Sequence, residues 1–304
     1  MKASFFRRFG GPEVLEYGEL PDPVPAAGEV LIEIHAASIN AADWKMRGGQ
    51  YPAKIEMPHV PGRDFSGVVL KDAGDLKAGE LVFGVCEVPR EGAYAEKIAI
   101  RQEIVTRKPA KLSHVQTAAI ALTGLTALIS IEDTLKLKRG ETILIQGGAG
   151  GVAGFAIALA KHIGARVITT ASASNHDYVR KLGADEVIDY RSQDFTKGVK
   201  NVDAVFDTVG GDVMERSYAV LKPGGRLASV GAGFTLPPPP RADVTALRPK
   251  VDRDRPHLDR VAELVTKGIV PLPEIIEYPL AKAADAHRVS EARHLRGKLV
   301  LVVR

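Results

Sequence analysis

Residues 146–154 constrain the fold of this chain more than any other segment. They read Gln-Gly-Gly-Ala-Gly-Gly-Val-Ala-Gly and lie between two apolar runs, residues 143–145 and 155–160. Strand, glycine-rich turn and helix in this order open a dinucleotide-binding unit, because glycines let backbone N–H groups approach a pyrophosphate at the helix N-terminus. Gly148 and Gly150, with an alanine three residues later, fit the G-x-G-x-x-G/A pattern. The sequence therefore predicts a dinucleotide site, with a purely structural turn as the alternative.

The second strand of this unit, residues 166–171, is not followed by a carboxylate. An Asp or Glu about 20 residues beyond the turn would bind the ribose 2′-hydroxyl of NAD. The chain has Ser172, Ser174 and Asn175 there instead, with Arg180 further on. Their hydroxyl and amide groups can hydrogen-bond a 2′-phosphate, and the same groups can cap the next helix. The two roles are compatible, and we predict NADPH rather than NADH.

Length and composition are those of an intracellular enzyme with two cores. The chain has 304 residues, 45% of them hydrophobic, and one cysteine, Cys86, which cannot form an internal disulfide. We see no signal pattern at the start of the sequence and expect a cytoplasmic protein with no membrane partner. Acidic and basic residues are interspersed, and the net charge is only +4, so we expect no nucleic-acid partner.

The pattern of apolar segments and turn residues changes along the chain. Residues 1–118 are rich in short β-like segments broken by Pro and Gly, whereas residues 119–258 alternate apolar strands and helices. Such alternation predicts an α/β fold with a doubly wound parallel sheet, a Rossmann fold. Residues 259–304 end in an apolar strand, which we expect to return to the first domain.

Several local motifs, in this order and spacing, are shared with one known superfamily. They are Asn-Ala-Ala-Asp-Trp-Lys (40–45), Val-Pro-Gly-Arg-Asp-Phe-Ser-Gly (60–67), Leu-Thr-Gly-Leu-Thr-Ala (122–127), the glycine turn, Leu-Gly-Ala-Asp (182–185) and Phe-Asp-Thr-Val-Gly-Gly (206–211). Over essentially its whole length the chain resembles the medium-chain dehydrogenase/reductases, specifically their zinc-free quinone oxidoreductase branch (zeta-crystallin-like proteins and enone reductases). The resemblance implies that residues 1–118 form a GroES-like catalytic domain.

The zinc ligands of the superfamily's alcohol dehydrogenases have no counterparts here. Asn40 stands where a cysteine ligand is expected, and Gly-Arg-Asp (62–64) replaces Gly-His-Glu. Cys86 alone cannot build a four-cysteine structural site, and we interpret His35 and His59 as packing or surface residues. We therefore predict no metal and no alcohol oxidation.

The reaction that remains is hydride transfer from a nicotinamide to an electron-poor acceptor, either a quinone or the β-carbon of an α,β-unsaturated carbonyl compound. By resemblance, Asn40, Asp43, Lys45 and Tyr51 contact the acceptor. Lys45 could stabilise an enolate or be an exposed lysine, and Tyr51 could donate a hydrogen bond or only line the site. Asp43 could hold Lys45 or Arg47 in place, or cap a helix.

The resemblance also assigns the cofactor contacts. The expected residues are Thr123 at the nicotinamide ribose, Gly148, Gly150, Gly151 and Val152 at the pyrophosphate, Ser172, Ser174, Asn175 and Tyr190 at the adenosine phosphate, and Val209, Gly231 and Ala232 at the nicotinamide. Ser174 occupies roughly the place where relatives have a lysine for the 2′-phosphate. We therefore expect NADPH to bind more weakly to this protein than to those relatives.

Two other functions fit the same sequence. One is a catalytically weak NADPH-binding protein, crystallin-like or RNA-binding, for which the basic residues between 241 and 255 would form the binding patch rather than a solvated loop. The other is an enoyl reductase acting on acyl thioesters. By resemblance we expect a homodimer.

Overall fold

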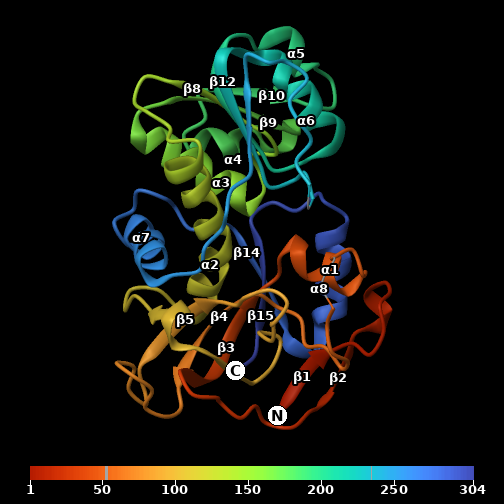
Figure 1. The fold of residues 1–304 in the computed structure, drawn as a ribbon, viewed down its shortest axis with the longest axis vertical. Coiled ribbons are helices and arrows are strands. Elements are labelled where there is room, and N and C mark those ends of the chain that lie inside the picture. The colour runs from red at the N-terminus through yellow and green to blue at the C-terminus, as the bar shows by residue number, and fades with distance from the viewer. Residues whose placement is uncertain (52–53, 234) are drawn as a thin grey trace. The chain divides into compact units, whose positions relative to one another are not determined.

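The computed structural model describes residues 1–51, 54–233 and 235–304, and these divide into two compact units. Unit 1 comprises Met1–Leu122, Arg253–Thr266 and Glu274–Arg304, and unit 2 comprises Thr123–Asp252 and Lys267–Pro273. Both chain termini belong to unit 1 (Figure 1).

The strands of unit 1 are β1 (Lys2–Phe5), β2 (Glu16–Glu19), β3 (Glu29–Ser38), β4 (Asp64–Val69), β5 (Leu81–Val85), β6 (Lys97–Arg101), β7 (Val105–Arg107), β14 (Ile275–Pro279) and β15 (Lys298–Val302). Its helices are α1 (Ala41–Arg47), α7 (Arg255–Thr266) and α8 (Ala283–Glu291), while α2 (His114–Leu128) runs from unit 1 into unit 2.

Unit 2 contains strands β8 (Thr142–Ile145), β9 (Arg166–Ala171), β10 (Glu186–Asp189), β11 (Val202–Asp207), β12 (Leu221–Ser229) and β13 (Thr245–Leu247). Its helices are α3 (Gly151–Ile163), α4 (His176–Lys181), α5 (Phe195–Gly198) and α6 (Gly211–Ser217). A π-helical turn (Ile129–Thr134) follows α2, and short 3-10 turns span Pro12–Val14, Gln102–Ile104, Ala173–Asn175, Tyr218–Val220 and Leu280–Lys282.

Unit 2 is the doubly wound sheet that the sequence predicts. Among the described residues its strands lie in the order β10-β9-β8-β11-β12-β13, and every neighbouring pair is parallel. The helices α3, α4, α5 and α6 lie beside these strands (Figure 1). Because the strand order reverses at β8, the carboxyl ends of β8, β9 and β11 meet at the point where open α/β sheets bind ligands.

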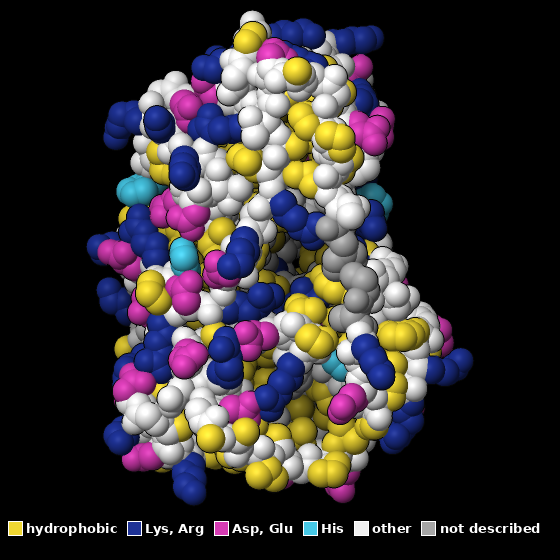
Figure 2. Space-filling model, in the orientation of Figure 1, with side chains coloured by type: hydrophobic (Ala, Val, Ile, Leu, Met, Phe, Trp, Pro, Cys, Tyr) yellow, Lys and Arg dark blue, Asp and Glu magenta, His cyan; other side chains and the backbone are white. Residues whose placement is uncertain are grey.

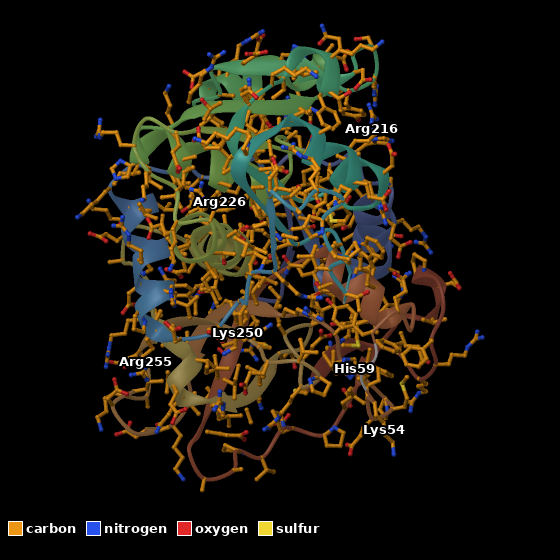
Figure 3. All side chains as sticks on the ribbon, turned by 45° about the horizontal axis from the view of Figure 1, so that its top comes forward. Lys54, His59, Arg216, Arg226, Lys250 and Arg255 are labelled. Atoms are coloured by element: carbon orange, nitrogen blue, oxygen red, sulfur yellow. The ribbon has the colours of Figure 1, made fainter. Side chains whose placement is uncertain are left out.

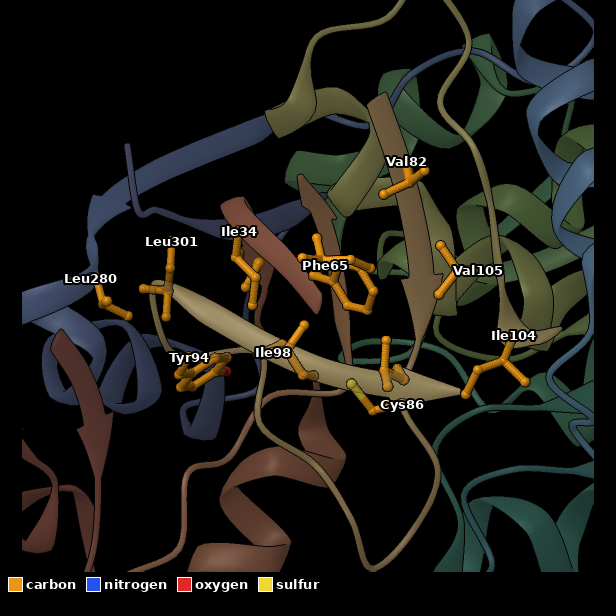
Figure 4. Packing of buried hydrophobic residues seen from close by; sticks show 14 of the residues in the cluster. Ile34, Phe65, Val82, Cys86, Tyr94, Ile98, Ile104, Val105, Leu280 and Leu301 are labelled. Carbon is orange, nitrogen blue, oxygen red and sulfur yellow. The ribbon is translucent and has the colours of Figure 1, made fainter. Parts of the chain in front are cut away.

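Unit 1 is built on an antiparallel β-rich sheet. Its strands follow the order β14-β15-β3-β4-β5-β7, with β6 also paired to β3. The core beneath it contains Ile34, Phe65, Ile98 and Leu301 among other apolar side chains (Figure 4). The terminal strand β15 pairs antiparallel with β3 and parallel with β14.

One helical segment, His114–Thr134, is long and apolar enough to cross a membrane by length and composition. However, 83% of its most apolar 18-residue window is buried inside the protein. Since small residues such as Ala118 and Ala119 pack against Ala36 of β3, the segment is a core helix.

The charged side chains are mostly paired, and Figure 2 shows acidic and basic groups interspersed on one face. In the basic region 241–255, Arg241 pairs with Asp243, Lys250 with Asp252 and Arg255 with Asp75. Lys250 and Arg255 are labelled in Figure 3. These three cations have carboxylate partners, while Arg248 Nη2 donates to Gly233 O and Arg253 Nε donates to Cys86 O.

Candidate functional site

The glycine turn after β8 has a shape that only glycine permits. Gly147 has a positive φ of 76°, and a Cβ on Gly148 would lie 2.3 Å from Thr169 Oγ1. The backbone N–H groups of Gly147 and Gly148 donate to Thr170 Oγ1 and Thr170 O, at 3.1 and 2.9 Å. These contacts with β9 hold the turn against the sheet.

The turn ends at the N-terminus of α3. Gly150 is the N-cap, and it has no side chain to satisfy the first helical N–H groups. The helix begins at Gly151 and Val152, whose backbone N–H groups belong to the first turn and have no intrahelical acceptor. This end of α3 therefore has free donors and a positive dipole for an anion such as a pyrophosphate.

The end of β9 carries the polar groups that the sequence predicts for a 2′-phosphate. Ser172 Oγ lies 3.2 Å from Ser174 Oγ and accepts a hydrogen bond from Asn175 Nδ2 at 3.1 Å. Tyr190, which follows β10, is 50% exposed, and the Arg191 guanidinium lies 5.9 Å from the centre of its ring. Hydroxyl, amide and guanidinium groups are thus present here, as an anionic phosphate requires.

A buried carboxylate shapes the loops that follow β11 and β12. Asp207 accepts hydrogen bonds from the N–H groups of Val209 and Gly210 and from Ser229 Oγ. Ser229 Oγ in turn accepts the N–H groups of Gly231 and Ala232, at 3.2 and 3.0 Å.

The two loops also approach each other closely, because a Cβ on Gly210 would lie 2.2 Å from Gly231 O. Val209, Gly231 and Ala232 were predicted cofactor residues, whereas Asp207 and Ser229, which position them, were not predicted. One signal could have revealed Asp207: it is an Asp at the end of an apolar strand, within the Phe-Asp-Thr-Val-Gly-Gly motif. Thr123 is buried in the middle of α2.

In unit 1, Asn40 and Asp43 define the start of α1. Asn40 is the N-cap, and its backbone N–H donates to Asp43 Oδ2 at 2.8 Å. This hydrogen bond makes Asp43 a helix-capping residue, which is one of the two roles that the sequence leaves open for it. Arg47, by contrast, bonds to Gly10 O, His287 and Glu291 rather than to Asp43.

The amide of Asn40 is bonded at both ends. Its Nδ2 donates to Asp64 Oδ1 at 3.1 Å, and its Oδ1 accepts from Lys298 Nζ at 2.8 Å. Asp64 also accepts both the N–H and the hydroxyl of Ser38 and the N–H of Leu122. Burial raises the pKa of Asp64 and lowers that of Lys298.

This arrangement does not fit a zinc ion. Asn40 stands at the position of a cysteine ligand, and its amide is already held by the Lys298 ammonium and the Asp64 carboxylate. Arg63, a cation, stands at the position of the histidine ligand. Within residues 1–51, 54–233 and 235–304, no group of three or more His, Cys, Asp or Glu side chains could hold a metal. Cys86 is fully buried among apolar side chains (Figure 4), and burial raises the pKa of its thiol.

Asp43 ends a chain of buried hydrogen bonds. Tyr94 Oη donates to Asp43 Oδ2 at 2.7 Å, and His287 Nε2 lies 3.3 Å from Tyr94 Oη. Because Arg47 Nη1 donates to His287 Nδ1, at 2.8 Å, the proton of this imidazole is on Nε2 and points to the tyrosine. Burial, and then the charge of Glu91, raise the pKa of Asp43 to about 8, so its carboxyl is protonated at neutral pH.

Lys45 and Tyr51 are partly buried near these groups. Lys45 Nζ lies 5.7 Å from the centre of the Trp44 ring, and burial together with Arg293 and Arg63 lowers the pKa of this lysine. The Arg63 guanidinium lies 4.5 Å from the centre of the Tyr51 ring, and burial raises the pKa of Tyr51. Lys45 and Tyr51 thus lie within electrostatic range of Arg63. From the sequence alone, Arg63 was noted only as part of the motif that replaces the zinc-binding Gly-His-Glu.

A parallel nucleotide-binding sheet in one unit and a GroES-like sheet in the other define a two-unit dehydrogenase/reductase architecture. Models of two families match the sequence: the alcohol dehydrogenase GroES-like domain at residues 26–110, and zinc-binding dehydrogenase at residues 182–301. The second name describes that family, whereas the described residues of this chain do not form such a site.

The chain is also similar to individual proteins over its full length. It is 32% identical to the NADPH-dependent alkenal/one oxidoreductase of Arabidopsis thaliana, over 99% of this chain and 79% of that protein. The structure of the quinone oxidoreductase from Coxiella burnetii matches with a TM-score of 0.95 and 36% identity, covering 100% of this chain and 99% of that one. Escherichia coli quinone oxidoreductase complexed with NADPH matches with a TM-score of 0.91 and 29% identity, covering 100% of both chains.

The chain therefore belongs to the quinone oxidoreductase branch of the medium-chain dehydrogenase/reductase superfamily. This confirms the family that the sequence motifs predict.

Proposed function

We propose that the protein is an NADPH-dependent, zinc-independent reductase that transfers hydride to a quinone or to the activated C=C bond of an α,β-unsaturated carbonyl compound. One observation carries the proposal. The residues proposed to contact the acceptor include a buried neutral acid, Asp43, and a half-buried lysine, Lys45. Among the described residues, no set of His, Cys, Asp or Glu side chains could hold a metal beside them. Such groups suit an acceptor that needs only its oxygen stabilised while hydride is added at carbon.

Unit 2 supplies groups that fit NADPH. The free N–H groups at the start of α3, at Gly151 and Val152, suit its pyrophosphate, and the turn at Gly148 and Gly150 leaves room for the approach. Ser172, Ser174, Asn175 and Tyr190 suit the 2′-phosphate, since no carboxylate follows β9. When bound, NADPH supplies the hydride.

The loops after β11 and β12 would hold the nicotinamide end. Asp207 and Ser229 fix the backbone at Val209, Gly231 and Ala232, so these positions present main-chain groups of set direction. Thr123 on α2 is proposed for the nicotinamide ribose.

In unit 1, Lys45 and Tyr51 are proposed to contact the acceptor, with Asp43 beside them. Asn40 takes a different role in this proposal. Because Asp64 and Lys298 already occupy both ends of its amide, it positions the start of α1 and thereby Asp43 and Lys45.

The test is the turnover of an alkenal and of a quinone by wild type, Lys45→Ala and Lys71→Ala. Lys71 is an exposed lysine of the same unit and serves as the matched control. We expect Lys45→Ala to lower kcat on the alkenal with little change in the NADPH dissociation constant, and Lys71→Ala to behave as wild type. Equal turnover by all three proteins would remove Lys45 from the acceptor site.

A further inference from the structure

Arg63 is a buried cation at the N-terminal end of β4, an inner strand of the unit 1 sheet. It lies directly before β4 and follows Gly62, whose φ is +100°. Its side chain is only 8% exposed, and its Nε donates to Glu91 Oε1 at 2.6 Å. The Glu91 side chain is fully buried, and its second oxygen lies 3.4 Å from His59 Nε2. Glu91 therefore holds the guanidinium in one orientation.

The ion pair with Glu91 and a hydrogen bond with Tyr51 leave part of the guanidinium unused. Among the described residues, Arg63 Nη2 is buried and has no hydrogen-bond partner. An arginine carries five N–H donors, and a buried donor without an acceptor costs free energy. Groups of this kind in a folded protein call for an explanation, and a bound ligand is one of the explanations.

A second buried polar atom nearby is also unsatisfied. Asp43 Oδ2 accepts two hydrogen bonds, from Asn40 N–H and Tyr94 Oη, while Asp43 Oδ1 has no partner among the described residues. Since the pKa of Asp43 is raised to about 8 by burial and by Glu91, its proton at neutral pH is on Oδ1, the oxygen without donors. Asp43 and Arg63 influence each other's pKa, so the two groups lie within electrostatic range.

Lys45 and Arg253 are further cations within electrostatic range of Arg63. Burial, followed by Arg293 and Arg63, lowers the pKa of Lys45, and burial followed by Arg63 lowers the pKa of Arg253. Burial opposes the charge on Arg63 itself, but Glu91 and Tyr51 raise its pKa, so it stays charged. An added anionic oxygen would reduce the repulsion among these cations.

We infer that Arg63 is an oxygen-binding catalytic residue of the acceptor site. Its Nη2, which is covered in this structure, donates to the acceptor oxygen beside the Asp43 carboxyl once the covering side chains move aside, and Glu91 is its positioning residue. The inference rests on the proposed reductase function and adds a residue to it.

The reaction explains why a donor is needed there. Hydride addition forms a C–H bond at the β-carbon of an enone, the C=C pair moves to the bond between the α-carbon and the carbonyl carbon, and the C=O pair moves onto oxygen. The acceptor gains two electrons and the nicotinamide is oxidised. The oxyanion accepts the hydrogen bond from Arg63, and a proton from water at the α-carbon completes the saturated product. For a quinone, the same donor would hold the hydroquinone oxyanion.

The test uses 4-nitrophenol, whose phenolate imitates the product oxyanion and has its own visible absorbance. Titration with the full-length protein should show that wild type binds the phenolate and lowers its apparent pKa. We expect Arg63→Met to weaken phenolate binding about 10- to 100-fold, the range for a hydrogen bond to a charged group. Arg63→Lys should retain part of the binding, because a lysine keeps the charge without the planar donor set.

Two further variants serve as controls. Arg101→Met replaces an exposed arginine of unit 1 that pairs with Glu87, and it should bind the phenolate as wild type does. The double variant Arg63→Met/Glu91→Gln removes both buried charges, which keeps the test available if Arg63→Met alone does not fold. Undiminished phenolate binding by a folded Arg63 variant, or no phenolate binding by wild type, would overturn the inference.

Turnover measurements separate this inference from the proposed function. In a working reductase, Arg63→Met should lower kcat without changing the NADPH dissociation constant. If no acceptor is turned over but phenolate binding still depends on Arg63, the oxygen site stands and the proposed function fails. If turnover is normal in Arg63→Met, the proposed function stands and the oxygen site fails.

Discussion

Replacing Asp43 by asparagine should change how the stability of the protein depends on pH. The carboxyl is fully buried, and burial together with Glu91 raises its pKa from the ordinary 3.8 to about 8. Between about pH 5 and pH 7 the folded protein therefore keeps a proton at this site that the unfolded chain has lost. The folded state then binds more protons, so the free energy of unfolding falls as the pH rises.

The size of the effect follows from one proton. In this window Asp43 contributes a slope of about −1.4 kcal/mol per pH unit, or about 2.7 kcal/mol between pH 5 and pH 7. The side-chain amide of the Asp43→Asn variant cannot titrate, and it imitates the neutral carboxyl in size and shape. The difference in unfolding free energy, wild type minus variant, should therefore fall by about 2.7 kcal/mol across this range.

Urea unfolding at several pH values and constant ionic strength measures this difference. Trp44, the only tryptophan of the chain, is buried next to Asp43 in α1 and reports the unfolding of unit 1 by its fluorescence. Asp177→Asn is the control, because this side chain is 92% exposed and is solvated in both states. Parallel profiles for wild type and Asp43→Asn would show that Asp43 is ionised in the folded protein, contrary to the raised pKa of its carboxyl.

Three further changes test other parts of the structure. Gly148→Ala should destabilise the protein by about 1–3 kcal/mol in urea unfolding, because its Cβ would lie 2.3 Å from Thr169 Oγ1; unchanged stability would mean that the turn can relax. Tyr190→Ala should raise the dissociation constant of NADPH about tenfold and that of NADH little, as measured by fluorescence titration, and equal effects on both would argue against a phosphate contact. Lys298→Met should cost about 3–5 kcal/mol of unfolding free energy, because it leaves the buried Asp64 without its cation. The double change Lys298→Met/Asp64→Asn should recover part of this loss, and a single variant as stable as wild type would show that the pair is not needed.

The nucleotide-binding unit could be predicted because its signals are local. The apolar strand, the glycine turn and the helix follow one another within residues 142–163, and each glycine acts on the backbone next to it. The apolar run of the tail likewise predicts a strand there, and β15 is such a strand, paired with β3.

The polar network of unit 1 could not be predicted from the sequence. Tyr94 and Asp43 are 51 residues apart, and His287 and Arg47 are 240 apart, so no local pattern links them. Charged residues are usually exposed, and Lys298 at the start of an apolar strand gave no sign that its ammonium is buried. Only the fold brings these side chains together, and burial then decides which of them hold a proton.

NADPH oxidation by chelator-treated protein across a panel of acceptors shows whether the enzyme reduces quinones or enones without a metal. The panel contains 9,10-phenanthrenequinone, 1,4-benzoquinone, an alkenal and a cyclic enone, with a primary alcohol and NADP⁺ for the reverse direction. We expect turnover of at least one quinone or enone without added metal and no oxidation of the alcohol. Activity on the alcohol alone, appearing only after zinc is added, would contradict it, and so would NADPH binding without turnover of any acceptor.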